Sequence, residues 1–159
     1  MASLSQTAAT LRNALPASSI WIVGGLTLVL DFSRLQKPLK PLSELEGLHG
    51  LAARPSDWGL LLPFGEMRVD GGASPLYCLN GYDSSIYCVD VERESDEPSQ
   101  FVNSSASQFI DCFRLINEFI HSGGHDVVRI LKELEHCDGE ALTQNSEWRR
   151  FLEHLRSSD

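Results

Sequence analysis

The sequence lacks the short motifs that usually identify an enzyme of this size. It contains no G-x-S-x-G nucleophile elbow, no G-x-x-x-x-G-K-[ST] phosphate loop and no G-x-G-x-x-G turn. The glycine pairs Gly24-Gly25 and Gly71-Gly72 are too short to surround a phosphate group. These absences argue against an enzyme and against a bound cofactor.

A set of four metal ligands is also missing. His121 and His125 are four residues apart, but Gly123-Gly124 lies between them and interrupts the helix that would hold both rings on one face. The consecutive ligands His136-Cys137-Asp138 point in different directions on a helix. We therefore expect no metal site.

The four cysteines form no C-x-x-C pair, and each lies in an apolar pattern that is typical of a small buried hydrophobic residue. They are Cys78, Cys88, Cys112 and Cys137. Cys78 and Cys88 flank a predicted turn at residues 80–85, so a disulfide across that hairpin is geometrically allowed. The absence of an export signal favours free thiols instead.

No hydrophobic run is long enough to span a bilayer. The longest candidate, Ile20–Leu30, has 11 residues, whereas a membrane-spanning helix needs roughly 20. Asp31-Phe-Ser-Arg34 follows it in place of a small-residue cleavage site, so a signal peptide is also disfavoured. We interpret the run as buried strand and expect a cytoplasmic protein without membrane contact.

Basic residues are few. The chain has 13 basic and 22 acidic residues and a net charge of -9, and residues 57–101 carry nine acidic and only two basic groups. The densest acidic run is Asp90–Glu97. Such a surface repels nucleic acid and attracts a basic protein. The simpler interpretation is a solvated loop, which is the usual role of a charge run.

What is present predicts a single α+β domain over residues 1–159, with helices packed on one face of an antiparallel sheet. Short β-branched and aromatic runs separated by turn residues predict a four-strand meander at 64–70, 76–79, 86–91 and 100–102. Strands are also predicted at 21–23 and 26–32, with Gly24-Gly25 as a tight turn or a bulge.

Helices are predicted on both sides of the strands. The first covers residues 3–14, with Ser3 or Ser5 as N-cap and one apolar stripe made by Leu4, Ala8, Leu11 and Leu15. The helix at 105–120 starts at a capping box formed by Ser105 and Gln108 and ends at Gly123-Gly124.

Two shorter helices are predicted after it, at residues 126–136 and about 146–155. Their expected buried residues are Val127, Leu131 and Leu134, then Trp148, Phe151 or Leu152, and Leu155. Residues 33–56 are rich in proline and leucine, and we expect them to pack as an excursion on the core.

The order of these segments resembles the SUKH superfamily. The residues that carry the resemblance are Phe64-Gly65, the strand pair Leu76-Tyr-Cys-Leu79 and Ile86-Tyr-Cys-Val-Asp-Val91, and the segment Phe101-Val-Asn-Ser-Ser-Ala-Ser-Gln-Phe109. The chain is most similar to the fourth SUKH immunity group, in which "Val-Asn-Ser-Ser" precedes a Phe-containing helix. A closing segment of that group is matched by Leu134, Asp138, Ala141, Leu142 and Trp148.

The resemblance covers roughly residues 58–155 and, more loosely, the N-terminal helix, whereas residues 33–56 match no motif. It implies a SUKH-like fold and a bacterial immunity protein that binds and neutralises a cognate toxin of a polymorphic or contact-dependent system. The superfamily is associated with toxins that include nucleases and nucleic-acid deaminases. A monomer in a 1:1 complex is the expected assembly.

A toxin that acts on nucleic acid tends to be basic, so the expected contact surface is the acidic middle of the chain. The candidate partner-binding residues are Asp83, Asp90, Glu92, Glu94, Asp96 and Glu97. Two other classes stay open. One is an adaptor or chaperone that holds a secreted effector or other cellular protein without inhibiting it. The other is a small hydrolase whose carboxylates or histidines meet only in the folded chain.

Overall fold

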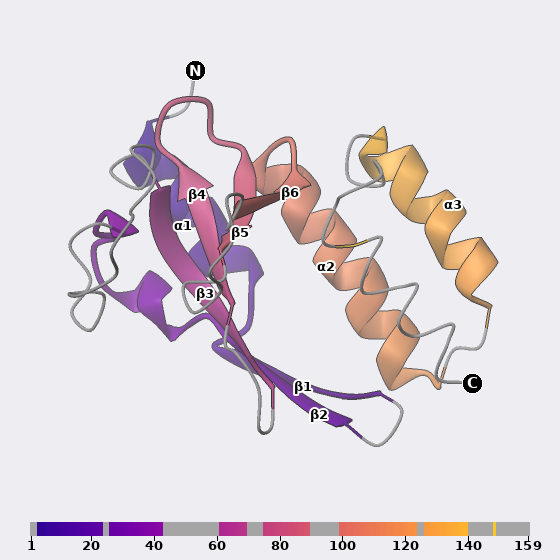
Figure 1. The fold of residues 1–159 in the computed structure, drawn as a ribbon. Helices are drawn as coiled ribbons and strands as arrows, with labels where there is room; N and C mark the ends of the chain where they lie inside the picture. The colour runs from indigo at the N-terminus through magenta and orange to yellow at the C-terminus, as the bar shows by residue number, and fades with distance from the viewer. Residues whose placement is uncertain are drawn as a thin grey trace.

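The computed structural model describes residues 3–23, 26–42, 61–69, 75–89, 99–123, 126–139 and 148. Within them, six antiparallel strands form one sheet, and every strand pairs with its neighbours in sequence (Figure 1). The strands are β1 (Ser18–Val23), β2 (Leu26–Asp31), β3 (Leu61–Val69), β4 (Leu76–Asn80), β5 (Ile86–Val89) and β6 (Ser99–Asn103). The predicted meander is therefore part of a longer one that begins at β1.

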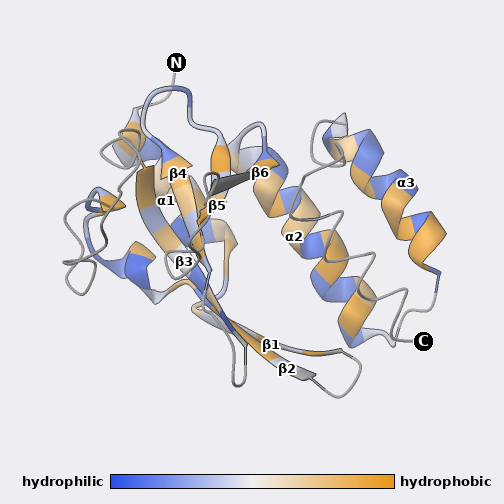
Figure 2. Cartoon of the chain, viewed as in Figure 1, coloured by the Kyte–Doolittle hydropathy of each residue, from blue (hydrophilic) through white to orange (hydrophobic). Residues whose placement is uncertain are grey.

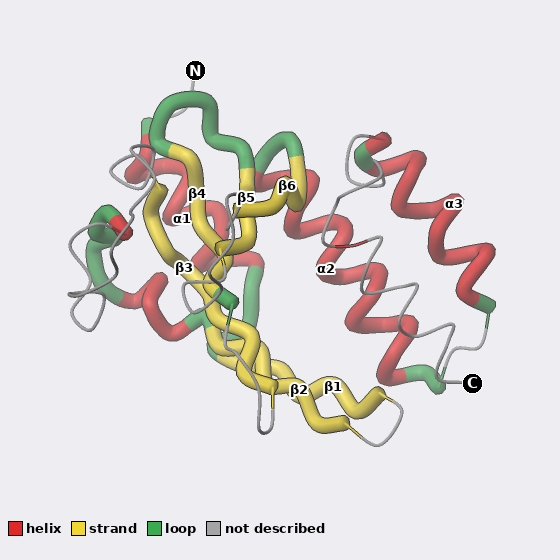
Figure 3. Tube along the Cα trace, in the orientation of Figure 1, coloured by secondary structure: helices red, strands yellow, loops and turns green. Residues whose placement is uncertain are grey.

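Three α-helices and one 3-10 turn complete the described elements. They are α1 (Leu4–Ala14), the 3-10 helix η1 (Ser33–Gln36), α2 (Ala106–His121) and α3 (Val127–Cys137). Figure 3 shows α2 and α3 side by side, with α2 between α3 and the strands. This confirms the predicted α+β class.

Local capping explains where α1 begins. The Ser3 hydroxyl accepts a hydrogen bond from the Gln6 amide at 3.2 Å, and the Gln6 side chain accepts one from the Ser3 amide at 2.9 Å. This reciprocal pair satisfies two backbone donors that the first turn leaves unpaired. Ser3 is thus the N-cap. The predicted apolar stripe is wrong at Leu4, which is 41% exposed, whereas Leu11 is fully buried.

The start of α2 differs from the prediction in one bond. Ser105 is the N-cap, and its hydroxyl accepts from the Gln108 amide at 3.2 Å. The Gln108 side chain does not complete a capping box, because its Oε1 accepts from the Ser105 hydroxyl at 2.9 Å and not from the Ser105 amide. Its Nε2 donates to the Cys137 carbonyl oxygen at 3.3 Å and so ties α2 to the end of α3. The glycine stop is confirmed by Gly123, whose φ of +70° is a conformation that side chains rarely adopt.

Helix α3 begins at an Asp126 N-cap whose carboxylate accepts from the Arg129 amide at 3.0 Å. Its buried residues are Val127, Ile130 and Leu134. The prediction of Leu131 is wrong in degree, because that side chain is only partly buried at the margin of the core. Trp148 is helical and fully buried as expected. Phe151, Leu152 and Leu155 lie outside the described residues.

An aromatic core fills the space between the sheet and the helices. Phe109 of α2 lies 5.4 Å from Phe64 and 5.6 Å from Tyr77 between ring centroids. Trp148 stacks on Tyr77 at 6.4 Å and also lies 5.9 Å from Phe109, so the three rings contact one another. Pairs at these separations stabilise by about 0.5–1.5 kcal/mol beyond the area they bury. Figure 2 shows the matching alternation of hydrophobic and hydrophilic residues along α2.

The opposite face of the sheet carries a second, smaller core. It consists of Leu42, Leu61, Leu76, Cys78 and Val89. Leu42 belongs to the excursion after β2, so the described part of that excursion, residues 33–42, packs on the core as predicted. Leu45 and Leu48 of the same segment lie outside the described residues.

The two cores place two of the cysteines on opposite faces. Cys78 belongs to the smaller core and Cys88 to the helix-facing one. Their cross-strand partners are Tyr87 and Tyr77 respectively, so the two thiols are not paired in register. All four cysteines are free. The cross-hairpin disulfide that the sequence allowed is therefore excluded by the register.

Strand β3 begins at Leu61, three residues before the predicted start at Phe64. Its register against β4 shifts between Pro63 and Gly65. A Cβ atom at Gly65 would lie 2.6 Å from Cδ1 of Phe32, so only glycine leaves room for that ring. The irregularity thus lets the Phe32 ring reach Phe64, with 6.3 Å between ring centroids.

Candidate functional site

The clearest polar feature is buried at the end of β6. The register between β5 and β6 shifts, so that Ile86 pairs with Asn103 and Tyr87 with Phe101. Val102 is therefore the extra residue of a bulge, and both Val102 and Asn103 are fully buried. A strand without this bulge would turn one of the two consecutive side chains away from the core.

The buried amide of Asn103 connects three segments that are distant in sequence. Its Oδ1 accepts from the Trp148 indole Nε1 at 2.7 Å. Its Nδ2 donates to Asp138 Oδ2 at 3.1 Å and to Cys112 Sγ at 3.3 Å. Because buried polar groups are costly unless bonded, this set fixes how the segments after α3 and after β6 meet.

Asp138 is the acceptor at the centre of this network. Its Oδ2 also accepts from the Ser104 amide at 2.8 Å, and its Oδ1 accepts from the Ser104 hydroxyl at 2.9 Å. We call Asn103, Ser104, Asp138 and Trp148 the buried clamp. Asn103 belongs to this clamp and not to the cap of α2, because Ser105 caps α2 while Asn103 binds Asp138 and Trp148. The described contacts give the clamp a structural role.

The clamp lies at the base of the turn between β4 and β5. Asn103 pairs with Ile86 on β5, and Ile86 pairs in turn with Leu79 on β4. Leu79 and Ile86 flank the turn at 80–85. Both Leu79 and Ile86 are fully buried. The turn therefore projects from a fixed base, as the loop between β4 and β5 in Figure 1 shows.

Side-chain oxygens brace the turn itself. Asn80 Oδ1 accepts from the Tyr82 amide at 2.8 Å, and Asp83 Oδ1 accepts from the Ser85 amide at 3.0 Å. The backbone closes through Asn80 N to Ser85 O and Ser84 N to Asn80 O, both 2.8 Å. Ser84 has a φ of +64°, which is uncommon for a residue other than glycine.

Two residues of this braced turn are exposed. Asp83 is one of the predicted partner-binding residues. Tyr82 is 83% exposed, more than any other large hydrophobic residue that the structure describes. The sequence analysis missed Tyr82. The signal for it was an aromatic residue in the middle of a turn rich in Asn, Gly, Asp and Ser, where no strand partner can cover it.

The other predicted partner-binding residues lie outside the described residues. They are Asp90, Glu92, Glu94, Asp96 and Glu97. Strand β5 runs from Ile86, next to the turn, to Val89, which precedes Asp90 in sequence. Asp83 is therefore the one predicted partner-binding residue that the described part of the chain contains, and its grouping with the acidic run stays a prediction.

A charged cluster occupies neighbouring positions of β2 and β3. Arg68 pairs with Asp31 and, at 3.3 Å, with Glu66, and Arg34 lies 4.0 Å from Glu66. Hydrogen bonds from the Ser33 hydroxyl and amide, helped by the nearby Arg68 and Arg34, lower the pKa of Asp31. The two arginines balance the two carboxylates of this cluster, whereas the turn at 80–85 carries Asp83 without a basic residue.

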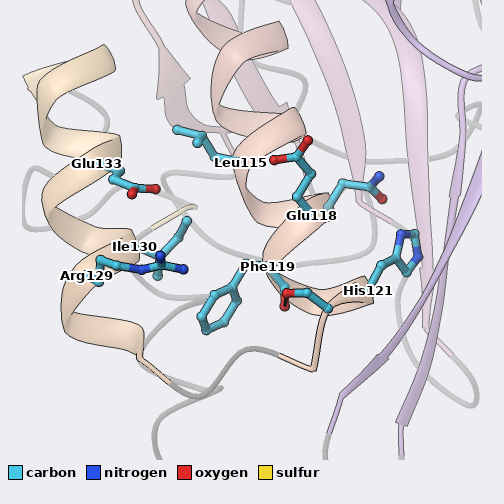
Figure 4. Close-up of a pocket in the computed structure, with 9 residues that line it drawn as sticks. Leu115, Glu118, Phe119, His121, Arg129, Ile130 and Glu133 are labelled. Atoms are coloured by element: carbon cyan, nitrogen blue, oxygen red, sulfur yellow. Dashed lines mark hydrogen bonds between the residues drawn. The ribbon is translucent and has the colours of Figure 1, made fainter.

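A groove of about 710 Å³ lies between α2 and α3 (Figure 4). Arg129 and Glu133 line it from α3, and Glu118 and His121 from α2. His121 Nε2 is bonded to the Ile20 carbonyl oxygen at 3.0 Å, so the ring is held at the edge of β1. These contacts form no arrangement of nucleophile and base in the described part of the groove.

The thiols are poor nucleophiles. Burial raises the pKa of Cys112 to about 12, and burial also raises the pKa of Cys78 and of Cys137. Because the thiolate is the reactive form, the buried thiols of Cys78 and Cys112 are inert near neutral pH, and the partly exposed Cys137 thiol is less reactive than a free one. Among the described residues no three potential metal ligands come together. His125, which the sequence analysis considered together with His121 and rejected as a metal ligand, lies outside them.

No helix in the described part of the chain combines the length and the apolar character needed to cross a bilayer.

Comparison with known proteins adds one match. The model of a family described as SUKH-4 immunity protein matches residues 5–154. That range contains the turn and all four residues of the buried clamp. No curated protein and no solved structure matches the chain.

Proposed function

The chain belongs to the SUKH-4 immunity protein family, and from this we propose that it binds and neutralises a cognate toxin that acts on nucleic acid, by covering the toxin's basic cleft with an acidic surface. The family match carries the immunity function and implies a toxin as partner. The net charge of -9, with nine acidic residues between positions 57 and 101, supports a basic partner.

The mechanism is binding without catalysis. Carboxylates displayed on a fixed scaffold occupy the positions that phosphates take in the toxin's substrate channel, so substrate and inhibitor compete for one site. Opposite charges also accelerate the encounter, and this acceleration weakens as salt is raised. A monomer that forms a 1:1 complex in the cytoplasm is sufficient for this role.

Co-expression with a candidate toxin domain tests the function, and a toxin encoded by a neighbouring gene is the first to try. We expect cells that express the toxin alone to stop growing and cells that also express this protein to survive. If the two proteins bind but growth is not rescued, the chain is a non-inhibitory adaptor and the proposal fails. Binding alone does not separate these functions.

A charge-matched pair of variants tests the acidic surface. The first variant changes four residues of the acidic run to their amides: Glu92→Gln, Glu94→Gln, Asp96→Asn and Glu97→Gln. The control makes the same change in charge on α2 and α3: Asp111→Asn, Glu118→Gln, Glu133→Gln and Glu135→Gln. We expect slower association and weaker protection only for the first variant. Equal effects from both would show that net charge, and no particular surface, steers the toxin.

A further inference from the structure

We propose that Tyr82 and Asp83 together form a preformed anchor for a cationic side chain, best an arginine, on the surface of the cognate toxin. This inference rests on the proposed function and specifies one contact within it. Its evidence is the exposure of the two side chains and the bracing of the turn that carries them.

The exposure of Tyr82 is costly without a partner. A ring that is 83% exposed leaves its apolar surface in water. Tyrosine is enriched at the centres of protein interfaces, because it provides a large contact area with few rotatable bonds. The described exposed aliphatic residues, such as Ile22, lie on other elements, and none of them has an acidic residue next to it in sequence.

The turn is rigid before any partner arrives. Two side-chain oxygens and two backbone bonds hold it closed, each bond between 2.8 and 3.0 Å. Ser84 is kept at a positive φ, and backbone strain of this kind persists only where the surroundings enforce it. A preformed turn loses little conformational entropy on binding, so most of the contact energy appears as affinity.

The chemistry of the turn selects a cation. Asp83 uses Oδ1 to brace Ser85, and its Oδ2 has no hydrogen-bond partner among the described residues. The neighbouring ring offers a π face that attracts a guanidinium, and the carboxylate can accept its N–H donors. Asp83 is the only charged residue between positions 75 and 89, so nothing on this hairpin competes for a cation.

The test uses surface plasmon resonance at low and high salt to measure binding of a catalytically inactive form of the candidate toxin domain used in the co-expression experiment. We expect Tyr82→Ala to raise the dissociation constant about 30-fold, which is the scale of an interface hot spot. Tyr82→Phe should stay within about threefold, because the ring face is kept. Asp83→Asn should weaken binding and reduce its dependence on salt.

Ile22→Ala is the matched control, since Ile22 is 71% exposed on β1 and its truncation should leave affinity unchanged. Thermal melting of every variant verifies folding. If the unaltered protein binds tightly and Tyr82→Ala binds equally well, the anchor is refuted while the immunity function stands. If the unaltered protein does not bind, the proposed function itself fails. Equal losses for Tyr82→Phe and Tyr82→Ala would also refute the cation contact.

Discussion

The hydrogen bonds of the buried clamp predict that one substitution, Asn103→Asp, makes the stability of the fold depend on pH. Asn103→Asp replaces Nδ2, which donates to Asp138 Oδ2 at 3.1 Å, by an oxygen, and it keeps Oδ1 as the acceptor for Trp148. Two carboxylates would then face each other inside the core. Like charges this close cannot both stay ionised, so one carboxyl of the pair takes up a proton.

The cost follows from the distance. Two unit charges 3.1 Å apart repel by about 5 kcal/mol at an effective dielectric constant of about 20. Holding a proton at pH 7 on a carboxyl with an ordinary pKa of about 3.9 costs about 4 kcal/mol, which is the cheaper route. The expected loss at pH 7 is therefore about 4 kcal/mol, a large part of the 5–15 kcal/mol by which domains are usually stable.

The sign of the pH dependence is fixed by the same argument. The folded variant binds a proton that the unfolded chain has released, so its pKa is raised in the folded state. The stability of the variant relative to the unaltered protein is then highest at low pH, and it falls by about 1.4 kcal/mol for each pH unit above pH 4. Urea denaturation of variant and unaltered protein at pH 5, 6 and 7 measures this difference.

Asn117→Asp is the matched control. Asn117 Oδ1 accepts from the Trp21 indole at 2.8 Å, as Asn103 does from Trp148, but its other described partner is the Ser19 hydroxyl and not a carboxylate. Its loss of stability should be small and nearly independent of pH. A flat pH profile for Asn103→Asp, or the same slope in both variants, would refute the donor role assigned to Asn103.

Two further predictions concern packing and thiols. Gly65→Ala should destabilise the fold by about 1–3 kcal/mol in urea denaturation, because the new methyl group would lie 2.6 Å from the Phe32 ring, whereas Gly139→Ala, with nothing within 4 Å, should show no overpacking loss. In native protein at pH 8, an aromatic disulfide reagent should modify the partly exposed Cys137 and leave the buried Cys112 unmodified. Full denaturation should make both thiols accessible to the reagent. Rapid native reaction of Cys112, or a Gly65→Ala variant as stable as the Gly139→Ala one, would contradict these packing assignments.

The elements themselves were predictable because their signals are local. The caps at Ser3, Ser105 and Asp126 act on amides three residues away, and the stop at Gly123 acts within one turn. Alternation of apolar residues likewise located β4 and β5. Such bonds depend only on neighbours in sequence, so a reading of the sequence can find them.

The buried clamp was not predictable in the same way. The partners of Asn103 are 35 and 45 residues away, and their meeting depends on a bulge that displaces the register of β6 by one residue. The resemblance had separately marked the segment at Asn103 and the later residues Asp138 and Trp148. Nothing in the sequence states that these two marked segments bind each other.

The candidate site was half predicted for a related reason. Charge is visible in a sequence, and it led to Asp83. Exposure depends on what the rest of the chain covers, so the sequence around Tyr82 does not show whether the ring is buried or exposed. Only the closed turn, with its bonds from Asn80 and Asp83, shows that nothing described covers this ring.

The position of the clamp gives it a role in display as well as in stability. Asn103 pairs across the sheet with Ile86, and Ile86 follows the turn directly. Hydrogen bonds to Asp138 and Trp148 therefore fix the strand from which Tyr82 and Asp83 project. A surface that must meet one partner gains from a rigid base, because the entropy of ordering it is lost in folding and not in binding. This accounts for a buried polar network at the base of an exposed turn.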